Sequence, residues 1–260
     1  MQSGGLLKRY ATERFVWPVR ALVILGLIAL WEAHGRFVDP TWSSAPSLIA
    51  ERLVAWVRAD LFYNVGVTLS ESALGLAIGT PLGVAIGLAL GRSPLMAALL
   101  RPLIIAFNSI PVIALAPLLI MWFGLGLEPK IVLVAIVVFF LIFFNTFAGA
   151  QSVDDDWIAT LQLMSAGTDE QFRIVIAPAC IAWILSGLKS AIPYSLTAAT
   201  VGEMMVARAG VGHLITDAAS QVDMTGVYAA LMILMALGAV MNDLAARCEL
   251  RLLRWRQRGA

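Results

Sequence analysis

The chain has 260 residues, of which 60% are hydrophobic and 13% are charged, and its formal net charge is +1. Soluble domains average about 45–50% apolar and about 25% charged residues, so the composition excludes a soluble domain and predicts an integral membrane protein. The near-zero net charge gives no reason to expect a nucleic-acid partner. A Walker A phosphate loop needs a Gly-Lys dipeptide, which the sequence lacks, so the chain cannot be an NTPase of that type.

Six apolar segments are predicted to cross the membrane, because a spanning helix needs about 20 predominantly apolar residues. They are residues 17–34, 72–91, 98–124, 130–150, 176–203 and 224–245. The third is interrupted by Pro111 and Pro117, and Asn108 and Ser109 precede the first of these prolines. Irregular backbone at membrane depth is tolerated only where protein buries it or where it lines a cavity. The sequence therefore predicts an all-α membrane protein with about six transmembrane helices.

Between the first two spans, Pro46–Arg58 has apolar residues at helical spacing with charged residues opposite them. This pattern predicts a short amphipathic helix that lies at the membrane surface.

The second span carries a glycine at every fourth position, namely Gly75, Gly79, Gly83, Gly87 and Gly91. Positions four apart share one face of a helix, so these glycines form a ridge without side chains along which another helix can approach closely. Ordinary helix packing is one interpretation of the ridge, and a contact that moves during gating is the other.

An even number of spans puts both termini on the same side of the membrane. That side carries 12 of the 18 Lys and Arg residues and the other side carries five, so the positive-inside rule predicts that both termini are cytoplasmic. The chain then divides into a cytoplasmic N-terminal segment, a transmembrane domain and a basic cytoplasmic tail, which are residues 1–16, 17–246 and 247–260.

A polar stretch from Gln151 to Pro178 interrupts the apolar second half of the chain and is predicted to be cytoplasmic. Asp154–Asp156 can cap a helix that starts near Trp157, and Gly167-Thr168 is expected to end it before a second short helix. Two short helices with exposed apolar side chains would suit a hydrophobic groove on a partner protein. An amphipathic hairpin that rests on the bilayer is the alternative.

Lys189 is the charged residue that the sequence places deep inside a predicted span. Charges within the membrane mark functional sites by default, but a position at a protein interface is an equal alternative for Lys189.

Several stretches in fixed order resemble the inner-membrane permease subunits of binding-protein-dependent ABC importers, in the branch for nitrate, sulfonate, taurine and pyrimidine precursors. The resemblance covers most of the chain from about Pro46 onward. It rests on Pro117–Gly124, Asn145–Gly149, Gly187–Lys189, Pro193-Tyr194, Val201–Glu203, Gly210–Ile215 and Asp217–Ser220. It implies the type I ABC importer permease fold, with ATP and magnesium bound by partner ATPases and no cofactor or metal on this chain.

In such permeases the loop before the fifth span forms coupling helices that sit in a cleft of the ATPase. Here Phe172, Arg173 and Pro178 match the second half of the family motif, while Ser165 occupies the usual glycine position and Gly167 is the nearest glycine. The resemblance therefore assigns ATPase coupling to segment 151–176. The candidate residues are Trp157, Ile158, Leu161, Met164, Ser165, Ala166, Gly167, Thr168, Phe172 and Arg173.

The implied partners are two ATPase subunits, a second permease copy, a periplasmic or lipid-anchored substrate-binding protein and the lipids of the cell inner membrane. Candidates for the translocation pathway or gate are Asn108, Ser109, Lys189, Tyr194, Ser195 and Glu203. Their polar or cationic character would suit a small anion or a small polar organic molecule.

Two other classes of function compete with the permease. An ion- or proton-driven secondary transporter would need acids near the membrane midplane and an internal repeat, and the sequence indicates neither. An intramembrane enzyme would need a cluster of reactive side chains, and no such pattern occurs.

Overall fold

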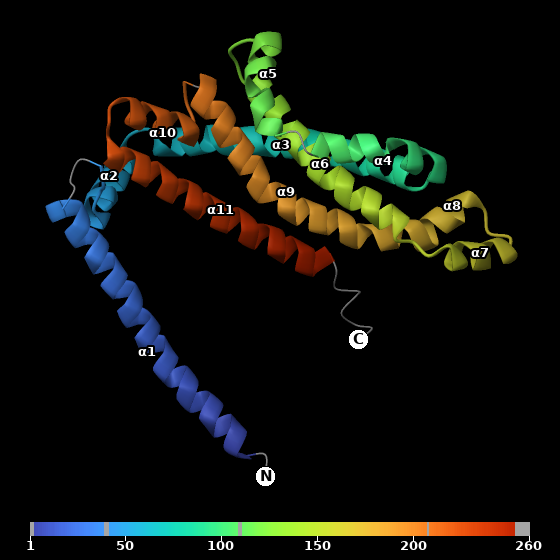
Figure 1. Ribbon diagram of the computed structural model, residues 1–260, viewed down its shortest axis with the longest axis horizontal. Helices are drawn as coiled ribbons and strands as arrows, with labels where there is room; N and C mark the ends of the chain where they lie inside the picture. The colour runs from blue at the N-terminus through green and yellow to red at the C-terminus, as the bar shows by residue number, and fades with distance from the viewer. Residues whose placement is uncertain (1–2, 39–41, 109–110, 207, 253–260) are drawn as a thin grey trace.

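The structure is a computed structural model that describes residues 3–38, 42–108, 111–206 and 208–252. Within these ranges the secondary structure is helical, as predicted (Figure 1). The long helices are α1 (Ser3–Ala33), α3 (Leu61–Gly91), α6 (Glu128–Gln151), α9 (Ala177–Val206) and α11 (Met224–Leu252). The shorter helices are α2 (Pro46–Arg58), α4 (Pro94–Asn108), α5 (Ala116–Phe123), α7 (Asp155–Leu163), α8 (Thr168–Gln171) and α10 (Val211–Ser220). Short π- or 3₁₀-helical turns are η1 (His34–Val38), η2 (Val112–Leu115) and η3 (Phe172–Ile176).

The packed centre of the bundle is the contact of α3 with α6, and the glycine ridge makes it possible. All five glycines of the ridge are buried. A Cβ atom at Gly79 would lie 2.5 Å from the carbonyl oxygen of Ala135, and one at Gly83 would lie 2.9 Å from that of Phe139. Backbone of α6 therefore occupies the space that side chains on α3 would need, which supports the packing interpretation of the ridge.

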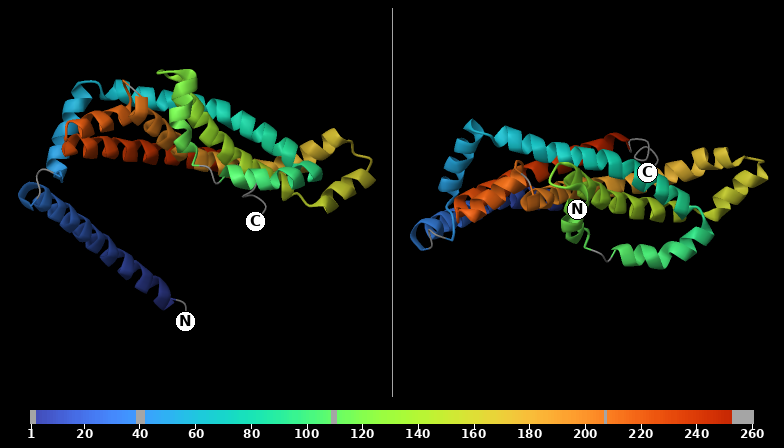
Figure 2. Two further views of the ribbon diagram at one scale, coloured as in Figure 1. Left: turned by 45° about the horizontal axis from the view of Figure 1, so that its top comes forward. Right: turned by 90° about the horizontal axis from the view of Figure 1, so that it is seen from above.

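The two central helices run in the same direction, because Gly75 faces Val134 near the start of α6 and Gly91 faces Ala150 near its end. Helix α9 runs in the opposite direction, since Gly149 faces Trp183 whereas Gly202 faces Lys130. As a result α7 and α8 lie at one end of the bundle, and α2 and α10 lie at the other (Figures 1 and 2).

Five helical segments of the described chain are long and apolar enough to cross a membrane: Trp17–Val38, Leu61–Gly91, Glu128–Gln151, Thr168–Val206 and Met224–Arg251. They overlap five of the six predicted spans. The predicted span 98–124 does not form one helix, because the chain is divided there into α4, η2 and α5. Pro111, which lacks a backbone N–H, directly precedes η2. Since α3 and α6 are parallel, these pieces carry the chain back along the bundle.

Helix α2 has the predicted bounds and joins the outer elements together. Its Arg52 forms an ion pair with Asp223, which directly precedes α11. Helix α1 extends away from the bundle (Figure 1) and is attached at its C-terminal end. There Glu32 accepts a hydrogen bond of 3.0 Å from the backbone N–H of Ser47, at the start of α2.

Candidate functional site

The segment from residue 151 to 176 projects beyond the end of the bundle as two short helices joined by a tight turn (Figure 1). The side chain of Asp154 caps α7 by accepting a 3.0 Å hydrogen bond from the N–H of Asp156. Gly167 precedes α8, and its N–H donates to the carboxylate of Glu170 at 3.1 Å. The predicted pair of short helices is therefore confirmed, but the first helix ends at Leu163, earlier than the predicted break at Gly167-Thr168, and Thr168 begins the second helix.

The turn between the helices gives Ser165 a backbone conformation that glycine usually adopts. Its φ is 61°, in the left-handed region. The N–H of Ser165 donates to the carbonyl of Gln162 at 2.9 Å, and the N–H of Ala166 donates to that of Leu161 at 3.0 Å. These two bonds form the Schellman motif that commonly ends a helix, with Ser165 at its glycine position. Ser165 occupies the usual glycine position of the family motif, and its left-handed φ is the conformation that glycine adopts most easily.

We expect Ser165→Gly to stabilise the segment by about 1 kcal/mol, because glycine removes the steric cost of the left-handed conformation. Hydrogen exchange at the amide of Ala166 should slow in this variant. Ser165→Ala serves as the control, because it keeps a Cβ atom and should give no such protection. If both variants protect the amide of Ala166 equally, relief of the left-handed conformation is not the cause of the protection.

The surface of the segment carries large apolar side chains with little protein around them. Leu163, at the end of α7, is 88% exposed, and Trp157, Met164 and Phe172 are exposed as well. Leu163 was not among the predicted residues, although its position beside Met164 at the turn is a signal that could have found it.

The other candidates for coupling differ in exposure. Ser165, Gly167, Thr168 and Arg173 are exposed, and Leu161 and Ala166 are half-buried. Ile158 is buried in a cluster with Val153, Ile176 and Cys180. It supports the segment from inside and is not part of its surface.

The predicted pathway residues do not converge on one site. Lys189 forms an ion pair with Glu249 of α11, with 2.9 Å between Nζ and Oε2, which places it at a helix interface. Tyr194 is exposed, whereas Ser195 is buried and donates to the carbonyl of Ile192 at 2.7 Å. Asn108 ends α4 but its side chain lies outside the described part of the structure, and Ser109 is outside the described residues.

Glu203, the remaining candidate, belongs to a buried polar cluster at the end of the bundle opposite the coupling segment. Its carboxylate accepts hydrogen bonds of 2.7 Å from the hydroxyl of Thr68 and from the N–H of Gly212. Beside it, Lys130 of α6 forms an ion pair with Glu71 of α3. Glu71 and Glu203 are each 1% exposed and Lys130 is 5% exposed.

Sequence reasoning missed Glu71 and Lys130 because it began the second span after Glu71 and assigned Lys130 to the edge of the fourth. Helix α3 begins at Leu61, so Glu71 lies inside the helix and not before it, as the predicted span had implied. The sequence nevertheless contains a signal for this polar cluster. Asn64, Thr68 and Ser72 are also spaced four residues apart, and a step of three leads from Ser72 to Gly75, so the face that carries the glycine ridge becomes a polar stripe toward the start of α3.

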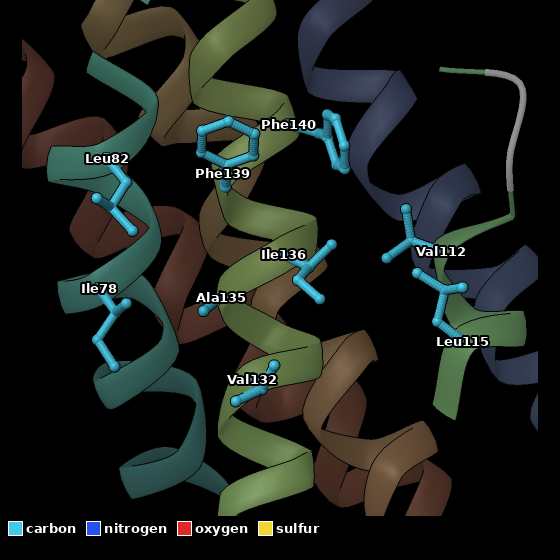
Figure 3. A pocket seen from close by; sticks show the side chains of 9 residues that line it. All are labelled: Ile78, Leu82, Val112, Leu115, Val132, Ala135, Ile136, Phe139 and Phe140. Atoms are coloured by element: carbon cyan, nitrogen blue, oxygen red, sulfur yellow. The ribbon is translucent and has the colours of Figure 1, made fainter. Parts of the chain in front are cut away.

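A separate cavity of about 570 Å³ lies where η2 faces the α3–α6 pair (Figure 3). Ile78 and Leu82 of α3 line one side, and Val112 and Leu115 of η2 lie across from the residues of α6. All nine residues that line the cavity are apolar, and none is a predicted pathway residue. The divided third span therefore leaves an apolar hollow beside the glycine ridge.

Residues 79–254, which form most of the chain, match the family described as the binding-protein-dependent transport system inner membrane component. The chain belongs to this permease family. It is 30% identical to the formylaminopyrimidine transport permease ThiX of Halalkalibacterium halodurans, over 91% of this chain and 95% of that one. It is 31% identical to the riboflavin permease RibX of Chloroflexus aurantiacus, over 94% and 92% of the two chains. It is 29% identical to the putative aliphatic sulfonates permease SsuC of Bacillus subtilis, over 96% and 91%.

A solved structure, that of an amino acid ABC transporter, has the same fold as this permease. The superposition has a TM-score of 0.62 with 18% sequence identity, and it covers 76% of this chain and 98% of that one. The fold is thus that of a type I ABC importer permease. The resemblance to the sulfonate, taurine and pyrimidine branch is confirmed, and the protein is a multi-pass membrane subunit for transport.

Proposed function

We propose that this permease forms the membrane pathway of an ATP-driven importer and is driven by a separate ATPase that docks on segment 151–176. Two copies of the permease form the pathway, two ATPase subunits bind ATP and magnesium, and a periplasmic or lipid-anchored binding protein delivers the substrate. The exposed apolar turn around Leu163 and Met164 is the observation that carries the proposal.

The position and build of the segment both support docking. It lies beyond the end of the bundle, and its two helices are short, capped and anchored from below by Ile158 and Ile176. Apolar side chains held on a rigid support can enter a groove of a partner without a large loss of conformational entropy. The same rigidity lets the segment pass a movement of the ATPase to α9, with which it is continuous through η3.

The proposed orientation places both termini and the coupling segment in the cytoplasm. The distribution of Lys and Arg supports this orientation. The separation of the two ends of the bundle also supports it, because α2 and α10 would then face the periplasm, where the binding protein docks (Figure 2). In this arrangement α4, η2 and α5 together provide the third of six crossings.

For the substrate we propose a small anion or a small polar organic molecule. The names of three relatives refer to a formylaminopyrimidine, to riboflavin and to aliphatic sulfonates, all of which fit this description. The binding protein that works with this permease determines the choice, and its ligand would identify the substrate.

The proposal is tested by purifying the permease together with the neighbouring ATPase and reconstituting the complex in liposomes. We expect ATP hydrolysis that rises when loaded binding protein is added, and substrate uptake that depends on ATP. Deletion of residues 157–172 should abolish ATPase binding. Binding that survives the deletion would overturn the role of the segment.

The same liposomes test the alternative of an ion- or proton-driven secondary transporter. The buried carboxylates of Glu71 and Glu203 are the kind of group that such a transporter uses. Uptake that follows an ion gradient in liposomes that contain the permease without the ATPase would favour that alternative and refute ATP-driven import.

A further inference from the structure

The buried cluster at the end opposite the coupling segment contains an oxygen atom without a hydrogen-bond partner. Oε1 of Glu71 is paired with Lys130, but Oε2 of Glu71 is buried and has no partner among the described residues. Glu203 lies in the same buried site, because its Oε1 accepts a hydrogen bond from Thr68, which is one turn before Glu71 on α3. Lys130 also lies beside it, since a Cβ atom at Gly202 would be 3.2 Å from Cγ of Lys130. Two carboxylate oxygens cannot bond to each other unless one of them carries a proton.

The charges of the cluster also require that one carboxyl group carries a proton. Glu71, Lys130 and Glu203 are almost completely buried. With both carboxylates ionised the three side chains would carry a net negative charge, and two like charges would be adjacent in a site with little water. Burial of an uncompensated charge is costly, and carboxylates that share a site retain one proton for this reason.

The hydrogen bonds show which oxygen has room for the proton. Both oxygens of Glu203 already accept bonds, one from Thr68 and one from the N–H of Gly212, and an ionised carboxylate suits both. In Glu71, by contrast, Oε2 has no hydrogen-bond partner among the described residues. A proton on Oε2 of Glu71 turns that atom into a donor and leaves Lys130 and Glu203 as one balanced pair of charges.

We propose that this permease has a proton-binding site between Glu71 and Glu203, with the proton on Glu71. The bound proton completes a hydrogen-bonded latch that holds the start of α10 on α3 and α9.

The latch is visible in the first amides of α10. The N–H of Gly210 donates to the side-chain oxygen of Asn64 at 2.7 Å, that of Val211 to the hydroxyl of Thr68 at 2.9 Å, and that of Gly212 to Glu203. The N–H groups at the start of a helix have no partners within the helix, so these side chains satisfy them. The negative charge of Glu203 also favours this end of the helix dipole. A proton on Glu71 stabilises Glu203 as the ionised acceptor that α10 requires.

The test compares Glu71→Gln with Glu203→Gln in the purified full-length permease. The amide introduced by Glu71→Gln can donate to Glu203 as protonated Glu71 does, so we expect the melting temperature of this variant to match that of the wild type. The amide introduced by Glu203→Gln has one acceptor oxygen where the carboxylate of Glu203 has two, so one donor is left unsatisfied. We expect Glu203→Gln to lower the melting temperature by about 5 °C and to speed hydrogen exchange at Val211 and Gly212 about tenfold.

Infrared spectroscopy detects the proton directly. The wild type should show the carbonyl band of a protonated carboxylic acid at neutral pH, and Glu71→Gln should lack it. Glu71→Met is the control for the donor, because it has a similar size but cannot donate, and it should be destabilised. The proposal is overturned if Glu71→Gln is as unstable as Glu71→Met, or if the wild-type spectrum lacks the band. Both readouts use the permease alone and are independent of whether an ATPase drives it.

Discussion

Gly79→Leu is expected to prevent the permease from folding into a stable bundle. A Cβ atom at this position already lies 2.5 Å from the carbonyl oxygen of Ala135 and 2.9 Å from Cβ of Val138. Because these are atoms of the backbone and of a stiff β-branched side chain, they cannot rotate away. The added carbons would push α3 and α6 apart along their whole contact, at a cost of about 3 kcal/mol or more.

Gly66→Leu is the matched control, since Gly66 lies on the same helix and a Cβ atom there meets nothing within 4 Å. The measurement is the fraction of each variant that elutes as a single folded species in detergent, followed by its melting temperature. Similar losses in both variants would show that glycine itself, and not the close approach of α6, is what α3 requires.

Features with a local period could be predicted from the sequence. The four-residue spacing of the glycines identified the packing face of α3, and the charge pattern of Pro46–Arg58 gave the bounds of α2. Gly167-Thr168 correctly indicated two short helices, although the first ends at Leu163, before this pair, and Thr168 begins the second. Each of these signals lies within a few turns of one helix.

Features that depend on pairing between distant helices could not be predicted. Glu71 and Lys130 meet because α3 and α6 run parallel in one register, and the sequence of either helix alone does not contain that register. Lys189 was ambiguous for the same reason, since its partner Glu249 is on α11. The burial of Ile158, a residue of α7, also depends on how the coupling segment folds back on the start of α9.

Buried charged residues explain why the second predicted span is shorter than α3. The predicted second span begins after Glu71 because a charged residue ordinarily ends an apolar run. In the folded protein Glu71 is buried and bonded to Lys130 of α6, so the helix continues through it. A run of uncharged residues is therefore shorter than the helix that contains it whenever a charged residue of that helix has a buried partner.

Leu163→Arg is expected to release the ATPase while the permease still folds. Leu163 is 88% exposed at the tip of the coupling segment, so the permease by itself tolerates the change. In the complex the new charge would be buried in an apolar groove without a partner, which costs several kcal/mol. We therefore expect the amount of ATPase that copurifies to fall at least about tenfold.

Gly167→Arg should act in the same way, because a Cβ atom at Gly167 meets nothing within 4 Å and its φ is negative. Leu125→Arg is the matched control: Leu125 is 81% exposed but lies in the loop before α6, at the proposed periplasmic side. It should leave ATPase binding unchanged. Normal ATP-driven uptake by both Leu163→Arg and Gly167→Arg would contradict docking at this turn. Loss of the ATPase in the Leu125 variant as well would point to a general defect of the permease, because a local contact at the coupling segment cannot produce that result.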